Sequence, residues 1–171
     1  TKLLNRNMHT LKKNQNHNTR LIEFCLNYAY PDGNITLQRL IDDNLINGTQ
    51  VAELAVCRTN GSIDIHPIGI GMDLTDDSDV KTGTVQVEQY KSTKGTTLVR
   101  HRVQIKDIVN KIGLLRVIVF NPLTNTWSFF KIPNVEFAAI KRLTISYCQR
   151  TGNPIGKYKQ FQVPGWVDLC N

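Results

Sequence analysis

Residues 114–120, LLRVIVF, decide the fold, because six of these seven side chains are apolar. A short run that is rich in β-branched residues and followed by the turn Asn121-Pro122 predicts a strand buried on both faces. After that turn, residues 126–132 (TWSFFKI) predict a second strand, which ends at Pro133-Asn134. These two strands predict the centre of a β-sheet.

Around this centre, the spacing of apolar residues predicts further elements. Helices are predicted over residues 19–30, 37–46, 50–58, 98–112 and 135–143. A hairpin is predicted over residues 63–74 and 80–90, an edge strand over 144–148, and irregular structure over the last twenty residues. The order of helices, hairpin, helix, strand, strand and helix predicts an α/β fold, with a mixed sheet flanked by helices.

The composition is typical of one globular domain, residues 1–171. The chain is 40% hydrophobic, and no apolar run approaches the roughly 20 residues that a membrane-spanning helix needs. The polar, basic start does not resemble a signal peptide. Four scattered cysteines without a Cys-x-x-Cys pair favour reduced thiols over a zinc site. We therefore expect a soluble, cytoplasmic protein.

The formal net charge of +7 is unevenly distributed. Basic residues dominate residues 1–20, which include a basic arm at 1–17, and also residues 81–106 and 141–171. Four of the 14 acids lie within seven residues: Asp73, Asp76, Asp77 and Asp79. Basic segments around an acidic cluster are the pattern of a metal site that faces a phosphate backbone. A solubilising turn with scattered surface lysines would give the same counts.

The acidic cluster contains the spacing Asp73, five residues, Asp79, one residue, Lys81. In a hairpin that turns near Asp77, Asp73 lies roughly across from Lys81. Asp79 and Lys81 are two apart on a strand, so their side chains share one face. Two converging carboxylates can bind Mg²⁺, and a lysine beside them can orient or deprotonate an attacking water. This arrangement suits hydrolysis of a phosphodiester.

This motif resembles PD-(D/E)xK of the restriction-endonuclease-like nuclease superfamily, and the elements expected over 49–132 resemble the order of that fold. The resemblance implies an Mg²⁺-dependent endonuclease, with Mn²⁺ able to substitute, which cuts double-stranded DNA and leaves 5′-phosphate ends. It implies that Asp73, Asp79 and the carbonyl of Val80 bind metal, and that Glu53 on the preceding helix assists. The dipeptide before the motif is Met72-Asp73 instead of Pro-Asp.

Several assignments stay open at this point. Asp64 also begins a predicted strand and competes with Asp73 as the first metal ligand. Glu53 could be an ordinary exposed helical residue, and His66 is best explained as a structural histidine. A restriction, homing or repair role would each use the same site.

The residues that follow the motif strand are the best candidates for DNA contact. They are Lys91, Thr93, Lys94, Arg100, His101 and Arg102. Cutting two strands with one small active site favours a homodimer. The alternative from another class is a non-catalytic nucleic-acid-binding module, in which the basic segments bind and the acids form a solvated turn.

Overall fold

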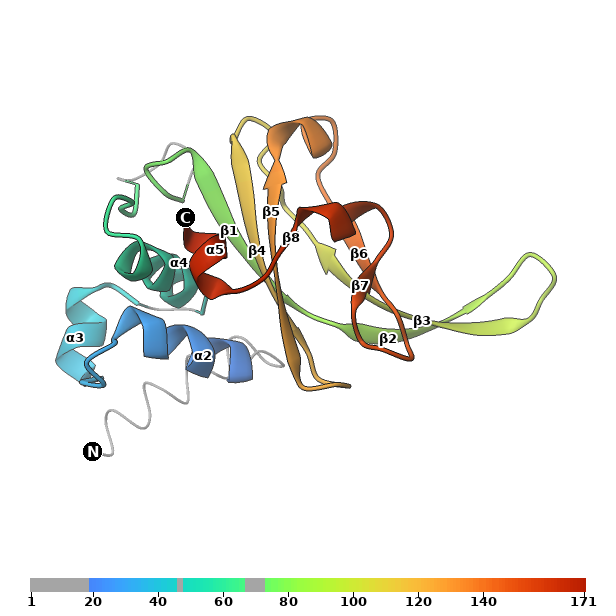
Figure 1. The fold of residues 1–171 in the computed structure, drawn as a ribbon, viewed down its shortest axis with the longest axis horizontal. Coiled ribbons are helices and arrows are strands. Elements are labelled where there is room, and N and C mark those ends of the chain that lie inside the picture. Colours follow the sequence, from blue (N-terminus) through green and yellow to red (C-terminus); the bar gives the residue numbers. More distant parts are fainter. Residues whose placement is uncertain (1–18, 46–47, 67–72) are drawn as a thin grey trace.

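The computed structural model describes residues 19–45, 48–66 and 73–171, which form three layers (Figure 1). Helices cover one face of a four-stranded sheet, and a second four-stranded sheet packs against its other face. The chain is therefore an α/β protein, as its sequence pattern predicted. The basic arm at 1–17 and the predicted strand residues 67–72 lie outside the described residues.

The first sheet is built around the predicted central strand. Its order is β1-β4-β5-β8, formed by β1 (Ser78–Thr84), β4 (Leu114–Asn121), β5 (Thr126–Pro133) and β8 (Gln162–Val163). β4 pairs in parallel with β1 and antiparallel with β5, and seven of its eight residues are buried. The two strands predicted at 114–120 and 126–132 are thus confirmed.

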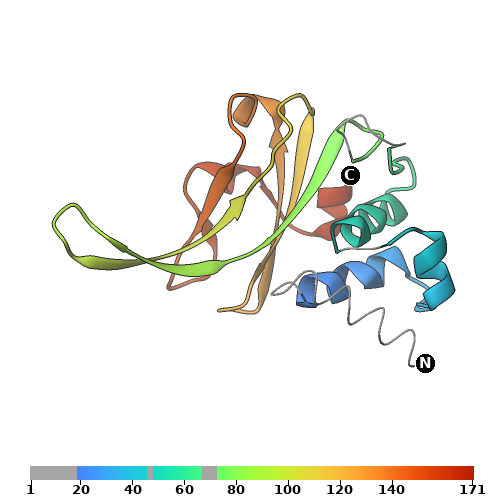
Figure 2. The ribbon, with the colours of Figure 1, turned by 180° about the vertical axis from the view of Figure 1, so that it is seen from behind.

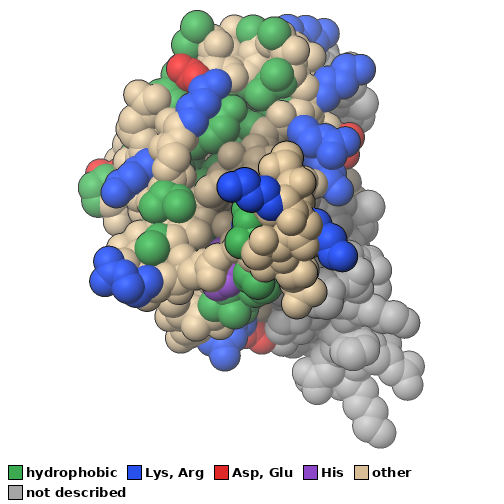
Figure 3. Space-filling view, turned by 90° about the vertical axis from the view of Figure 1, so that its right-hand side faces the viewer, with side chains coloured by type: hydrophobic (Ala, Val, Ile, Leu, Met, Phe, Trp, Pro, Cys, Tyr) green, Lys and Arg blue, Asp and Glu red, His purple; other side chains and the backbone are tan. Residues whose placement is uncertain are grey.

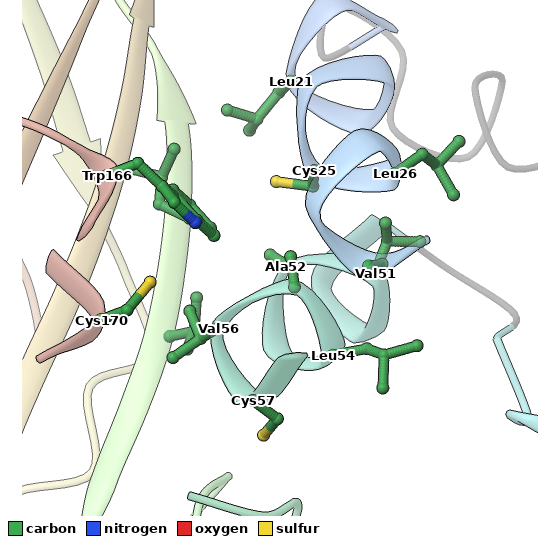
Figure 4. Packing of buried hydrophobic residues seen from close by; sticks show 14 of the residues in the cluster. Leu21, Cys25, Leu26, Val51, Ala52, Leu54, Val56, Cys57, Trp166 and Cys170 are labelled. Atoms are coloured by element: carbon green, nitrogen blue, oxygen red, sulfur yellow. The ribbon is translucent and has the colours of Figure 1, made fainter. Parts of the chain in front are cut away.

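Helices pack on one face of this sheet. They are α2 (Thr19–Ala29), α3 (Leu37–Asp42), α4 (Gly48–Thr59) and the C-terminal α5 (Trp166–Cys170). Figure 4 shows Cys25 of α2, Val56 of α4 and Trp166 of α5 in the core between them. The helices predicted at 19–30 and 50–58 are confirmed, whereas the one predicted at 37–46 ends at Asp42. None of the helices within the described ranges is long and apolar enough to cross a membrane.

The second sheet has the order β2-β3-β6-β7 and is antiparallel throughout. Its strands are β2 (Gln86–Lys91), β3 (Thr97–Ile105), β6 (Leu143–Tyr147) and β7 (Pro154–Ile155). β2 follows β1 after the single residue Val85, and the β2–β3 hairpin projects well beyond the body (Figures 1 and 2). Its turn contains Gly95 with a φ of +80°, a left-handed conformation that glycine adopts without a steric penalty.

The helix predicted at 98–112 is wrong, because residues 97–105 form strand β3. Val103 and Ile105 point into the core between the sheets, while Arg102 and Gln104 alternate with them and are less buried. That period of two is a strand pattern, although the wider set of apolar residues in 98–112, such as Leu98, Ile105 and Ile112, also fits a helical spacing. The helix expected after the motif in the restriction-endonuclease-like order is therefore replaced by a hairpin.

Three other predictions near the C-terminus are also wrong. Residues 135–143 contain only the short 3₁₀ helix η2 (Asn134–Glu136). The Asn134 side chain donates to the carbonyls of Asn110 and Ile112, which fixes this segment as a loop. β6 is an inner strand and not an edge strand. The last twenty residues, expected to be irregular, contain β7, the 3₁₀ helix η3 (Lys157–Phe161), β8 and α5.

Gly83 lies where β1 passes close to the second sheet. A Cβ atom at this position would come within 2.5 Å of Val103 Cγ2. We expect Gly83→Ala to destabilise the protein by about 1–3 kcal/mol, because the core must shift to admit the methyl group. Thermal unfolding of Gly83→Ala, Val103→Ala and the double variant checks this. The double variant should lose less stability than the sum of the losses in the two single variants. Strictly additive losses of stability would contradict the steric explanation.

Candidate functional site

A tight turn before β1 brings the motif residues together. The backbone N–H of Leu74 donates to the carbonyl of Ser78 at 3.0 Å, and Asp77 takes a left-handed φ of 65° inside the turn. The predicted pairing of Asp73 with Lys81 is wrong, because Leu74 pairs with Ser78 and the turn is therefore centred on Asp76, one residue earlier than expected. Asp73 instead lies beside Asp79 and Val80.

Two backbone N–H groups, those of Asp73 and Val80, connect the Asp73 and Asp79 carboxylates at the start of β1. The Asp73 N–H donates to Asp79 Oδ1 at 2.8 Å, and the Val80 N–H donates to Asp73 Oδ2 at 3.0 Å. Only 3% of Asp79 is exposed. Burial raises the pKa of both carboxyl groups, although these N–H donors oppose the shift. The pair is therefore a rigid, partly desolvated acidic unit at the start of β1.

Glu53 on α4 is the third carboxyl of the cluster. Its side chain hydrogen-bonds to the Asp73 carboxyl, and burial together with the charges of Asp73 and Asp79 raises the pKa of Glu53 to about 8. At neutral pH Glu53 therefore retains its proton and donates it to Asp73. The alternative of an ordinary exposed glutamate is inconsistent with this position.

Lys81 supplies a cation to the same cluster. Alternation along β1 places its side chain on the same face as that of Asp79, as the sequence predicted. Its positive charge opposes the rise that burial causes in the pKa of Glu53, Asp73 and Asp79. The Lys81 Nζ donates to the carbonyl of Asp107 at 3.1 Å, and this hydrogen bond fixes the position of the ammonium group.

The structure separates Asp64 from this cluster. The Asp64 side chain is exposed, and the charges that shift the Glu53 pKa are those of Asp73, Asp79 and Lys81. The Asp64 backbone pairs instead with Thr75. The N–H of His66 donates to the Asp73 carbonyl at 2.9 Å, so His66 supports the segment through its backbone. Of the two rivals, Asp73 is the acid that lies beside Asp79.

Arg116 is a structural residue of the site that the sequence analysis did not identify. It is 2% exposed inside β4, and its Nη1 lies 2.7 Å from Asp76 Oδ2 and 2.6 Å from Ser78 Oγ. Its Nε donates to the carbonyl of Leu169 in α5 at 2.8 Å. Arg116 therefore connects the motif turn to the C-terminal helix, and Asp76 is its ion-pair partner in the turn. A lone arginine within an apolar run is the signal that could have identified it.

The cluster contains two carboxylates of the kind that a hard divalent cation prefers. Among residues 19–45, 48–66 and 73–171, no three His, Cys, Asp or Glu side chains stand together in an arrangement that could hold a metal ion. Mg²⁺, however, is commonly bound by one or two carboxylates, with waters and substrate phosphate completing its shell. Asp73 and Asp79 offer two such carboxylates. The carbonyl of Val80 remains a predicted ligand.

The raised pKa of Glu53 has a consequence for stability. In the folded protein Glu53 keeps its proton up to a pH of about 8, whereas in the unfolded chain it releases the proton above its ordinary pKa of 4.5. The unfolded state therefore binds fewer protons in this range, and the free energy of unfolding falls as pH rises from about 4.5 to about 8. Without metal, we expect Glu53→Gln to match the wild type near pH 4 and to melt on the order of 5 °C higher at pH 8. Thermal melts in EDTA across this range check this, with Glu23→Gln as a control. Parallel profiles for wild type and Glu53→Gln would contradict it.

The residues predicted to contact DNA lie on the projecting β2–β3 hairpin. Lys91 ends β2, and Thr93 and Lys94 lie exposed in the turn at its tip. Arg100 and Arg102 share one face of β3, whereas His101 faces the opposite side, opposite Val87 and Tyr147 in the register. The hairpin therefore presents two different faces, only one of which carries both arginines.

Comparison with known proteins adds no family assignment. No protein-family model matches the chain, and no curated protein sequence matches it significantly. The resemblance to restriction-endonuclease-like nucleases rests on the motif residues and stays a prediction.

Proposed function

We propose that this chain is an endonuclease that hydrolyses phosphodiester bonds of double-stranded DNA with Mg²⁺, or with Mn²⁺ in its place. One observation carries the proposal: Glu53, Asp73, Asp79 and Lys81 lie in one partly buried cluster, although they come from a helix, a turn and a strand. Carboxylates that can hold a divalent cation, with an ammonium group beside them that can act on a water, suit metal-assisted phosphodiester hydrolysis.

Each residue has a distinct role in this proposal. Asp73 and Asp79 hold the cation, and a bound Mg²⁺ would offset negative charge on the phosphate that reacts. Lys81, held by the carbonyl of Asp107, orients the attacking water and accepts its proton when deprotonated. Glu53 positions Asp73 through their hydrogen bond. Water attack on phosphorus would leave 5′-phosphate and 3′-hydroxyl ends.

Incubation of purified protein with supercoiled plasmid tests the reaction. We expect nicked and linear products with Mg²⁺ or Mn²⁺ and none with EDTA. The linear ends should be ligatable without phosphorylation, because they retain a 5′-phosphate. Protein that binds the plasmid but never nicks it with either metal would overturn the proposal. Discrete product bands would favour site-specific, restriction-type cutting, and a dimer in solution would match the cutting of two strands.

The second candidate is a non-catalytic DNA-binding module. The observation that favours it is the projecting β2–β3 hairpin, which carries Lys91, Lys94, Arg100 and Arg102 and can bind DNA without any metal. Unlike the first candidate, a DNA-binding module gives no role to the three partly buried carboxyl groups near Lys81. The plasmid assay distinguishes the two.

A further inference from the structure

One face of the β2–β3 hairpin carries an ordered row of side chains, which we call the ribbon face: Glu88, Tyr90, Arg100 and Arg102. Glu88 pairs with Arg100 in the register, and alternation places Tyr90 and Arg102 on the same face. Arg100 Nε and Arg102 Nε lie 3.1 and 2.6 Å from the same oxygen of Glu88. The Arg100 guanidinium also lies over the Tyr90 ring, 4.6 Å from its centroid. The two arginines are therefore held in place before any ligand arrives.

This arrangement leaves the outer ends of both arginines available. Each uses Nε toward Glu88, and within the described part of the chain no hydrogen bond engages their Nη1 or Nη2 atoms. The side chains of Arg100 and Arg102 are 41% and 20% exposed. A guanidinium held in one plane with two free N–H groups matches the oxygens of a phosphate. One carboxylate also cannot neutralise two arginines, so the ribbon face stays positive.

A polar cavity continues the ribbon face toward the acidic cluster. Its volume is about 270 Å³, and its lining includes Glu88, Arg102, Gln86, Gln104, Lys106 and Gly83. Lys106 is followed by Asp107, whose carbonyl accepts the hydrogen bond from Lys81. The cavity therefore reaches the end of β3 whose next residue but one hydrogen-bonds to Lys81, and a phosphate chain along the ribbon face would lead toward this end. Figure 3, seen from the hairpin end, shows many Lys and Arg side chains on this side and few acidic ones.

We propose that the ribbon face and its cavity bind the sugar–phosphate backbone of duplex DNA, with the two-stranded ribbon lying in the major groove. A ribbon of two strands has the width that this groove admits. Arg100 and Arg102 each bind a phosphate, Lys106 continues the track, and Glu88 is a positioning residue. That the ligand is duplex DNA rests on the proposed function, and the ribbon face is the surface that binds it.

Fluorescence anisotropy with a labelled 20-base-pair duplex in EDTA tests this without cleavage. We expect Arg100→Gln/Arg102→Gln to bind at least 10-fold more weakly at 0.1 M salt, with the slope of log K against log salt smaller by about 2. Arg100→Lys/Arg102→Lys should keep the slope but lose several-fold in affinity, because the planar fork is gone. Lys157→Gln/Lys159→Gln removes two charges outside the ribbon and is the matched control. Circular dichroism confirms that each variant folds.

The variant Glu88→Ala distinguishes two effects on DNA binding: the positioning of Arg100 and Arg102 by Glu88, and the general attraction of positive charge for DNA. It makes the ribbon more positive, so diffuse attraction alone would strengthen binding, whereas loss of the fixed arginines should weaken it about 3-fold. Stronger binding by Glu88→Ala, or equal losses in the Gln pair and its control, would overturn the inference. Equal affinity for single-stranded DNA or for duplex RNA would overturn the groove assignment. A ribbon-dependent complex that never cuts plasmid would uphold this inference and refute only the nuclease.

Discussion

Lys81→Ala should reduce the rate of DNA cleavage by a factor of about 10²–10⁴ while duplex binding persists. The reason is that Lys81 is near enough to Glu53, Asp73 and Asp79 for its charge to oppose the rise in their pKa, which burial causes. Removing it leaves the attacking water without an orienting partner. Initial rates of plasmid nicking at saturating protein measure the loss, and anisotropy in EDTA measures binding.

The control for this prediction is Lys111→Ala, which removes an exposed lysine from the loop that follows β3. Its cleavage rate should stay within about twofold of the wild type, because Lys111 does not contribute to the pKa shifts of the cluster. Unchanged melting temperatures in both variants would exclude unfolding as the cause. Cleavage by Lys81→Ala at the wild-type rate would remove Lys81 from the site even if the protein is a nuclease.

Arg116→Met should lower the free energy of unfolding by about 3–5 kcal/mol, or the melting temperature by about 10 °C. The substitution leaves the Asp76 carboxylate and the Leu169 carbonyl without the partner that lies 2.7 and 2.8 Å away. It also frees the turn that positions Asp73 against Asp79. We therefore expect cleavage to fall even at temperatures where Arg116→Met remains folded.

A double variant shows whether the ion pair is the cause. Arg116→Met/Asp76→Asn removes both charges and should recover part of the lost stability, because no uncompensated carboxylate remains. Lys131→Met, at the position that pairs with Arg116 on β5, should cost less than about 1 kcal/mol. Losses that simply add in the double variant would mean that Arg116 acts through packing alone.

Much of the fold could be predicted where one local pattern had only one explanation. LLRVIVF is too short for a helix and too apolar for a surface strand, and β4 is buried as expected. Residues 98–112 have a pattern with two explanations, because Leu98, Ile105 and Ile112 recur every seven residues as on a helix, while Val99, Val103 and Ile105 follow a period of two as on a strand. Only the packing of β3 between β2 and β6 decides in favour of a strand. β7 and β8 are two residues long and arise from tertiary pairing, which no local pattern encodes.

The sequence pattern indicated residues that the structure brings together, but it did not predict their geometry. Asp73, Asp79, Lys81 and Glu53 were identified from spacing and resemblance, and they lie in one cluster. The register was wrong because Leu74 pairs with Ser78, which centres the turn on Asp76 instead of Asp77. Arg116 was missed because its partners in α5 lie 53 and 54 residues further along the chain. Contacts of that separation cannot be derived from the spacing of residues in one segment.

The most direct test of the central claim compares wild type and Asp79→Asn in one plasmid-cleavage time course with Mg²⁺. Asp79→Asn keeps the shape of the side chain and an oxygen for the Asp73 N–H, but removes the charge that would hold the cation. We expect the wild type to cut with Mg²⁺ and to be inactive in EDTA, and Asp79→Asn to be inactive in both. A wild type that binds duplex but never cuts, or an Asp79→Asn variant with full activity, would contradict the account.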